Sequence, residues 1–118
     1  AGAGAQLLLE RLADRSGINL DSLRCSEGRF ATGPDLALAI RDKEIDCGLA
    51  TRAVAATHGL DFIPLVWERF DLVLRRRTYF EPASHRFFAF LRDEDLGLRA
   101  AALGGYNLSR TGTVRLNR

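Results

Sequence analysis

Short apolar runs alternate along this chain with segments that have the periodicity of helices. Residues 45–50, 62–66 and 70–74 are the apolar runs, and each predicts a strand. Pro64 favours an edge or strand-end position for the second run, because proline cannot donate a ladder hydrogen bond. Strands that alternate with helices predict an α/β domain in which parallel strands are joined by crossover helices.

The first two helices are predicted from stripes and caps. Apolar residues recur at i, i+3, i+4 and i+7 from Ala5, which predicts an amphipathic helix over residues 4–16 that ends at Gly17. Residues 32–35 read Thr-Gly-Pro-Asp. Proline suits the first turn of a helix and aspartate complements its positive end, so a second helix is expected to start there.

Three more helices are marked by their end residues. Thr51 is expected to cap a helix over residues 52–58 that is closed by Gly59. Pro82 opens a fourth helix, and Gly104-Gly105 ends a fifth. The chain beyond them is polar and predicts an extended loop or a terminal strand.

Size and composition indicate an ordinary globular chain. Its 118 residues lie in the single-domain range, with 47% hydrophobic and 27% charged residues. A net charge of +2 is too balanced to indicate nucleic-acid binding, and the basic run 75–77 is best interpreted as a solvated strand end. No apolar run approaches the ~20 residues of a membrane span.

Cysteine and histidine patterns indicate neither a metal site nor catalysis. Cys25 and Cys47 are too far apart for a CxxC pair, and two cysteines with two scattered histidines do not predict a zinc site. We expect buried free thiols, with a disulfide left open; reduced thiols would fit the cytoplasm. His58 precedes a helix-closing glycine, where a structural role is favoured. No nucleophile elbow, HExxH motif or P-loop occurs, so we expect no catalytic residue, no cofactor and no enzyme.

Three predicted helix starts have the chemistry of an anion receptor. They are Gly2-Ala3-Gly4, Thr32-Gly33 and Thr51-Arg52. Free N–H groups and partial positive charge at a helix start favour anions, and ligands of α/β folds bind beside such starts. If the three starts converge on one cleft, they would bind a small anion or carboxylate.

Four segments resemble one known family. Residues 46–53, Asp-Cys-Gly-Leu-Ala-Thr-Arg-Ala, resemble its D-x-G-L-G segment. Residues 60–65 and 68–73 resemble its L-D-F-x-P-L and E-R-Y-D-L-V pair, and residues 103–112 resemble its closing G-G-Y-x-x-S-x-T-G. This family is the molybdate-binding-protein-like domain of the type 2 periplasmic-binding fold, which occurs fused to helix-turn-helix regulators and to molybdopterin-biosynthesis proteins.

The resemblance implies a two-lobed α/β fold. Residues 1–66 would form lobe two, and residues 67–118 would be the return strand and C-terminal helices towards lobe one, whose first part would be absent. Gln6 stands where the family often has arginine, which removes a positive charge from the site. The implied ligand-binding residues are Gly2, Ala3, Gly4, Ala5, Thr32, Gly33, Thr51 and, more weakly, Tyr106.

The implied function is the binding or sensing of a small anion, such as molybdate or another oxyanion. Its expected partner is a fused or separate DNA-binding domain in a cytoplasmic regulator. The alternative is a periplasmic solute receptor of an ABC transporter, and weaker alternatives are an enzyme or a degenerate assembly domain. A missing lobe would leave apolar surface exposed and favour a homo-oligomer, without membrane insertion.

Overall fold

The computed structural model describes residues 4–115 and divides the chain into two compact units. Unit 1 is Ala1–Phe62 and unit 2 is Ile63–Arg118. The sequence predicted a boundary between two lobes after residue 66. The two units are defined by contacts within this chain, which do not test whether they are lobes of a ligand-binding fold. The lobe assignment therefore stays a prediction.

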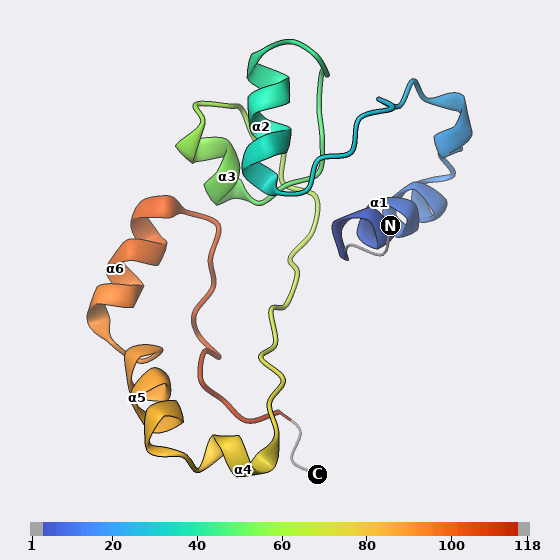
Figure 1. The fold of residues 1–118 in the computed structure, drawn as a ribbon. Coiled ribbons are helices and arrows are strands. Elements are labelled where there is room, and N and C mark those ends of the chain that lie inside the picture. The colour runs from blue at the N-terminus through green and yellow to red at the C-terminus, as the bar shows by residue number, and fades with distance from the viewer. Residues whose placement is uncertain (1–3, 116–118) are drawn as a thin grey trace. The chain divides into compact units, whose positions relative to one another are not determined.

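The described residues of unit 1 form three α-helices and one turn of 3₁₀-helix (Figure 1). Among the described residues of this unit, α2 packs closely against α3. Their bounds are α1 Gly4–Ser16, the 3₁₀ turn Leu20–Ser22, α2 Gly33–Arg41 and α3 Arg52–Thr57.

Up to residue 115, unit 2 contains three further helices, of which α4 packs on α5. The ring centroids of Tyr79 in α4 and Phe88 in α5 are 5.0 Å apart. The bounds are α4 Arg76–Tyr79, α5 Pro82–Phe90 and α6 Glu94–Leu103.

The helix predictions are confirmed where caps and stripes supported them. Helix α1 has the predicted bounds, and α5 has Pro82 in its first turn. Gly59 follows the end of α3 with φ 66°, and Gly104 caps α6 with φ 74°. Residues with side chains rarely adopt these positive φ values, so glycine is favoured where the helix must stop.

The α/β fold class predicted from the sequence is wrong. Among residues 4–115 the structure contains helices and loops but no strand. The three apolar runs, 45–50, 62–66 and 70–74, lie in irregular segments without a backbone ladder. An apolar run becomes a strand only when another strand accepts its N–H groups, and no described segment does so.

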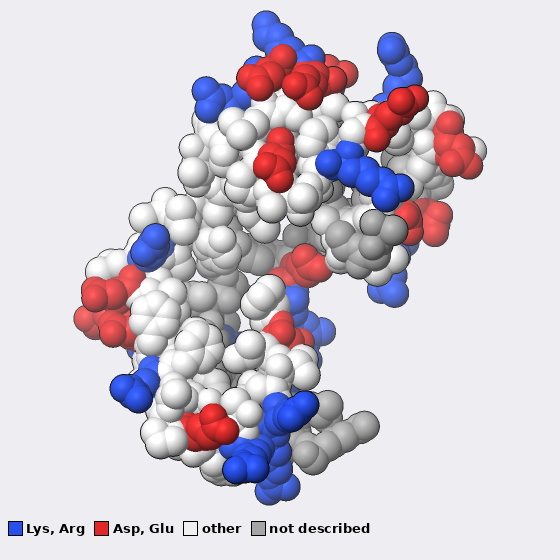
Figure 2. Space-filling model, viewed as in Figure 1, with Lys and Arg blue, Asp and Glu red and all other residues white. Residues whose placement is uncertain are grey.

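The short helix α4 was not expected from the sequence. Arg76 and Arg77, interpreted as part of a strand end, begin this helix, while Arg75 precedes it with extended φ −66° and ψ 142°. All three arginines are exposed. Figure 2 shows basic side chains gathered around α4 in unit 2, where they are arginines.

The residues that the structure buries are small. The buried hydrophobic residues are Ala13, Ala37, Ala39, Ala53, Ala55 and Ala100. No large side chain in the described part of the chain is fully buried. Hydrophobic stabilisation scales with the apolar area removed from water, so each unit gains little from its own core.

The two cysteines are free, and both are exposed. The expectation of free thiols is confirmed and the expectation of buried thiols is wrong, because Cys25 and Cys47 both lie in loops and not in the cores of the units. Over residues 4–115, no helix has the length and apolarity that a bilayer span requires.

Candidate functional site

Helix α2 starts with a reciprocal pair of side-chain caps. The Thr32 Oγ1 accepts a hydrogen bond from the Asp35 N–H at 3.3 Å, and an Asp35 carboxylate oxygen accepts one from the Thr32 N–H at 3.1 Å. The same carboxylate oxygen lies 2.7 Å from the Thr32 hydroxyl, which donates to it. The threonine predicted to contact a ligand is therefore already engaged by Asp35.

Helix α3 starts with a simpler cap. The Thr51 Oγ1 accepts a hydrogen bond from the Val54 N–H at 3.4 Å. Thr51 is exposed, and no carboxylate is bonded to its hydroxyl among the described residues. Its hydroxyl proton is therefore available to a ligand.

The two helix starts lie against each other. A Cβ placed on Gly33 would be 3.0 Å from Val54 Cγ2, so the first turn of α2 contacts the first turn of α3 directly. Glycine at this position permits the close approach, because a Cβ there would be closer to Val54 than ordinary van der Waals contact. Figure 1 shows α2 and α3 side by side.

Few backbone donors remain free at these starts. Pro34 has no N–H, and the Asp35 and Val54 N–H groups are bonded to the capping threonines. The N–H groups of Gly33, Arg52 and Ala53 have no hydrogen-bond partner within residues 4–115. These three are the donors that two adjoining helix starts can offer.

Arg52 adds a positive charge beside Thr51. Its guanidinium carbon lies 4.8 Å from the centroid of the Phe62 ring. This cation–π contact favours one position of the arginine side chain. No ion pair joins Arg52 to a carboxylate among the described residues. The sequence placed Arg52 in the third helix start, but it was not among the predicted ligand-binding residues.

Asp35 acts against anion binding at the same place. Its carboxylate already lies at the positive end of α2, where it satisfies donors that a ligand would otherwise use. The site thus combines a free guanidinium with one fixed negative charge.

The segment before Thr51 is held by a close contact with α2. A Cβ on Gly48 would be 2.7 Å from both Leu36 methyl carbons. This contact lets residues 45–50 pass against α2 and brings Thr51 to the start of α3. At the other end of α3, His58 Nδ1 donates to the Val54 carbonyl oxygen at 2.8 Å, which fits the expected structural role of His58.

The remaining predicted site residues stay predictions. Gly2 and Ala3 lie outside the described residues. Gly4 and Ala5 are exposed at the start of α1, which has no packing against α2 or α3 comparable to that between those two helices. Tyr106 is half exposed in unit 2.

Other parts of the described chain offer less. A shallow hollow on unit 2 is lined by Glu94, Gly97 and Leu98, none of which was predicted to bind a ligand. Within residues 4–115, no three His, Cys, Asp or Glu side chains are grouped as metal ligands.

Comparison with known proteins identifies the class of this chain. Residues 1–92 match the PBP superfamily domain, and the chain belongs to that family. The resemblance to a periplasmic-binding-protein-like domain is therefore confirmed. Domains of this family are generally ligand-binding domains and not enzymes.

Two relatives have been found by sequence. The chain is 28% identical over 116 residues to the uncharacterized protein YvgK of Bacillus subtilis (strain 168). The matched residues cover 98% of this chain and 37% of YvgK. It is 33% identical over 55 residues to an uncharacterized protein in the ferredoxin 2Fe-2S gene 5′ region of Clostridium pasteurianum, covering 47% of this chain and 49% of that relative. The matched residues thus span less than half the length of either relative. No solved structure matches it.

Proposed function

We propose that this chain binds a small oxyanion, with molybdate as the leading candidate, as the sensory part of a cytoplasmic regulator. The observation that carries the proposal is the match of residues 1–92 to the PBP superfamily domain, a ligand-binding class. The sensor would bias a fused or separate DNA-binding domain. A ligand can shift that equilibrium only by the difference in its affinity for the two states.

The chemistry around Arg52 supports an anion over a neutral ligand. The guanidinium is free of carboxylates in the described chain, and the Thr51 hydroxyl and the Arg52 and Ala53 N–H groups lie at the same helix start. Charge-assisted hydrogen bonds to an oxyanion are roughly twice as strong as neutral ones.

An extracytoplasmic receptor of an ABC transporter is the second candidate, because the same family match supports it equally. The two candidates differ in where the full-length protein is found. Fractionation of cells that express it will separate them: a regulator stays in the cytoplasm and a receptor is exported.

Thermal unfolding against a panel of oxyanions and small carboxylates tests the ligand. A ligand that binds only the folded form stabilises it by about 2.7 kcal/mol at a hundredfold excess over Kd. We expect molybdate or tungstate to raise the Tm, and Arg52→Gln to remove most of that rise. Arg41→Gln, at the other end of α2, is the matched control and should keep it. If no anion shifts the Tm of the unsubstituted chain, the oxyanion proposal is wrong.

A further inference from the structure

The way α3 ends allows Phe62 to return beside this helix. The Leu60 N–H donates to the Ala55 carbonyl oxygen at 2.9 Å. The Gly59 N–H donates to the Ala56 carbonyl oxygen at 3.2 Å. These two bonds form a Schellman motif, which ends a helix at a residue of positive φ, here 66°. The residues after Gly59 therefore leave the helical path and are free to run back beside α3.

The lengths of the two segments match this return. Helix α3 is Arg52–Thr57, six residues, and is therefore about 9 Å long. The segment from Leu60 to Phe62 can span up to about 10 Å. The Phe62 ring can thus reach the first residue of α3, and the guanidinium carbon of Arg52 lies over that ring, 4.8 Å from its centroid. The ring is half-buried, whereas the arginine is exposed.

This contact leaves the hydrogen-bond donors of Arg52 available. An arginine that lies over an aromatic ring is held by the face of its planar guanidinium. The N–H donors point outward in the plane of the group, and two of them together can bind two oxygen atoms of a ligand. Within residues 4–115, no hydrogen bond or ion pair joins the Arg52 guanidinium to another residue.

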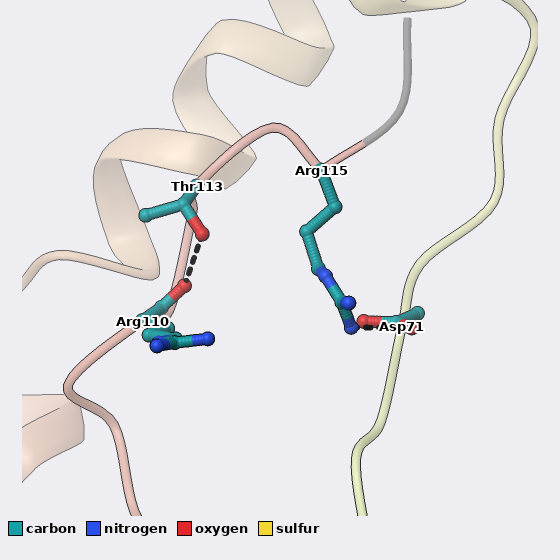
Figure 3. Close-up of polar contacts among 4 residues, drawn as sticks. All are labelled: Asp71, Arg110, Thr113 and Arg115. Atoms are coloured by element: carbon teal, nitrogen blue, oxygen red, sulfur yellow. Dashed lines mark hydrogen bonds and ion pairs between the residues drawn. The ribbon is translucent and has the colours of Figure 1, made fainter.

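Arg115 in unit 2 is held in a different way. Its Nη1 lies 3.4 Å from an Asp71 carboxylate oxygen (Figure 3). A carboxylate binds to N–H donors of the guanidinium, which are the same donors that an oxyanion would use. Phe62 restrains Arg52 without occupying these donors.

We propose that Phe62 is a positioning residue for the oxyanion, because it holds the Arg52 guanidinium in place with its N–H donors free. This inference rests on the oxyanion function proposed above. An arginine side chain loses rotamer freedom when it binds a ligand, and this loss lowers the affinity. The ring restricts the side chain before the ligand binds, so less freedom is lost on binding. Phe62 thus acts through Arg52 and not by contact with the anion.

Isothermal titration with molybdate tests this role. Phe62→Leu removes the ring but keeps an apolar side chain, and it should weaken binding about fivefold. Phe62→Tyr keeps the ring and should bind like the unsubstituted chain. Phe30→Leu is the matched control, because Phe30 is also half-buried in unit 1 and has no cation–π contact among the described residues. Its affinity should be unchanged.

The proton resonances of Arg52 give a second readout, which needs no ligand. An aromatic ring shifts protons above its face upfield. The side-chain protons of Arg52 should therefore be shifted upfield in the unsubstituted chain and in Phe62→Tyr, but not in Phe62→Leu. Circular dichroism shows whether each variant keeps its helices. If the leucine variant does not, Phe62→Met supplies a second side chain without a ring, with the same expected results.

Three results would overturn the positioning role. They are an unchanged affinity without the ring, an equal loss of affinity in Phe62→Tyr or Phe30→Leu, and Arg52 resonances without an upfield shift. As long as the unsubstituted chain binds molybdate, these results leave the oxyanion function standing. If it binds neither molybdate nor tungstate, both proposals fail, even where the resonances show that Arg52 lies over the ring.

Discussion

Gly48 lies so close to Leu36 that a Cβ at position 48 would be 2.7 Å from both methyl carbons of that leucine. Carbon atoms in contact are ordinarily about 3.5–4.0 Å apart, so a side chain at position 48 fits only if Leu36 or the loop moves. This contact fastens residues 45–50 to α2 and leads the chain into Thr51 and α3.

Gly48→Ala is expected to destabilise unit 1 by about 1–3 kcal/mol, the usual cost of overpacking. Urea unfolding followed by the circular dichroism of the helices measures it. Gly97→Ala is the matched control, because a Cβ there meets nothing within 4 Å and alanine favours α6 by up to about 1 kcal/mol. Equal stability changes of the two variants would contradict the Leu36 contact.

Thr51→Ala should cost about 1 kcal/mol of unfolding free energy, because the Val54 N–H loses its acceptor. Thr51→Ser keeps a hydroxyl at the cap and should lose much less. Thermal unfolding of both variants measures the difference. If the alanine and serine variants have the same Tm, the hydroxyl does not stabilise α3.

Asp35→Asn should tighten oxyanion binding roughly two- to fivefold, because it removes a negative charge from the start of α2 while keeping an acceptor for the Thr32 N–H. Isothermal titration with molybdate measures the change. An unchanged Kd at low ionic strength would place the bound anion away from this helix start.

Arg115→Gln should change the free energy of unfolding by less than about 0.5 kcal/mol. Both partners of its pair with Asp71 are about half exposed, and solvent screens such pairs. Unfolding at low and high salt should give the same small difference. A loss of more than about 1 kcal/mol would show that this pair holds the C-terminal segment in place.

Both thiols should react with Ellman's reagent in the native chain, because Cys25 and Cys47 are free and exposed. We expect two equivalents per chain without denaturant, at rates close to those of the unfolded chain. A thiol that reacts only after unfolding would contradict the exposure seen here.

The helices and their ends could be predicted because they depend on neighbours in sequence. The cap at Thr32 joins residues three apart, and the positive φ of Gly59 is a property of that residue itself. The capping threonines of the candidate site could be named for the same reason. Each backbone hydrogen bond of a helix joins residues four apart, so the local sequence contains the information needed to predict where the helix lies.

The strands and the assembled site depended on partners far along the chain. Apolar alternation in residues 70–74 describes a surface suited to a sheet, but a strand also needs a paired backbone, which tertiary structure did not provide here. The contact of Gly33 with Val54 and the stacking of Arg52 on Phe62 were likewise decided by how α2, α3 and the following loop pack. By itself the sequence determined the helical segments other than α4 and where they stop, because those bonds are local. Only tertiary structure decided which helix starts adjoin and which apolar runs remain unpaired, because those contacts join distant residues.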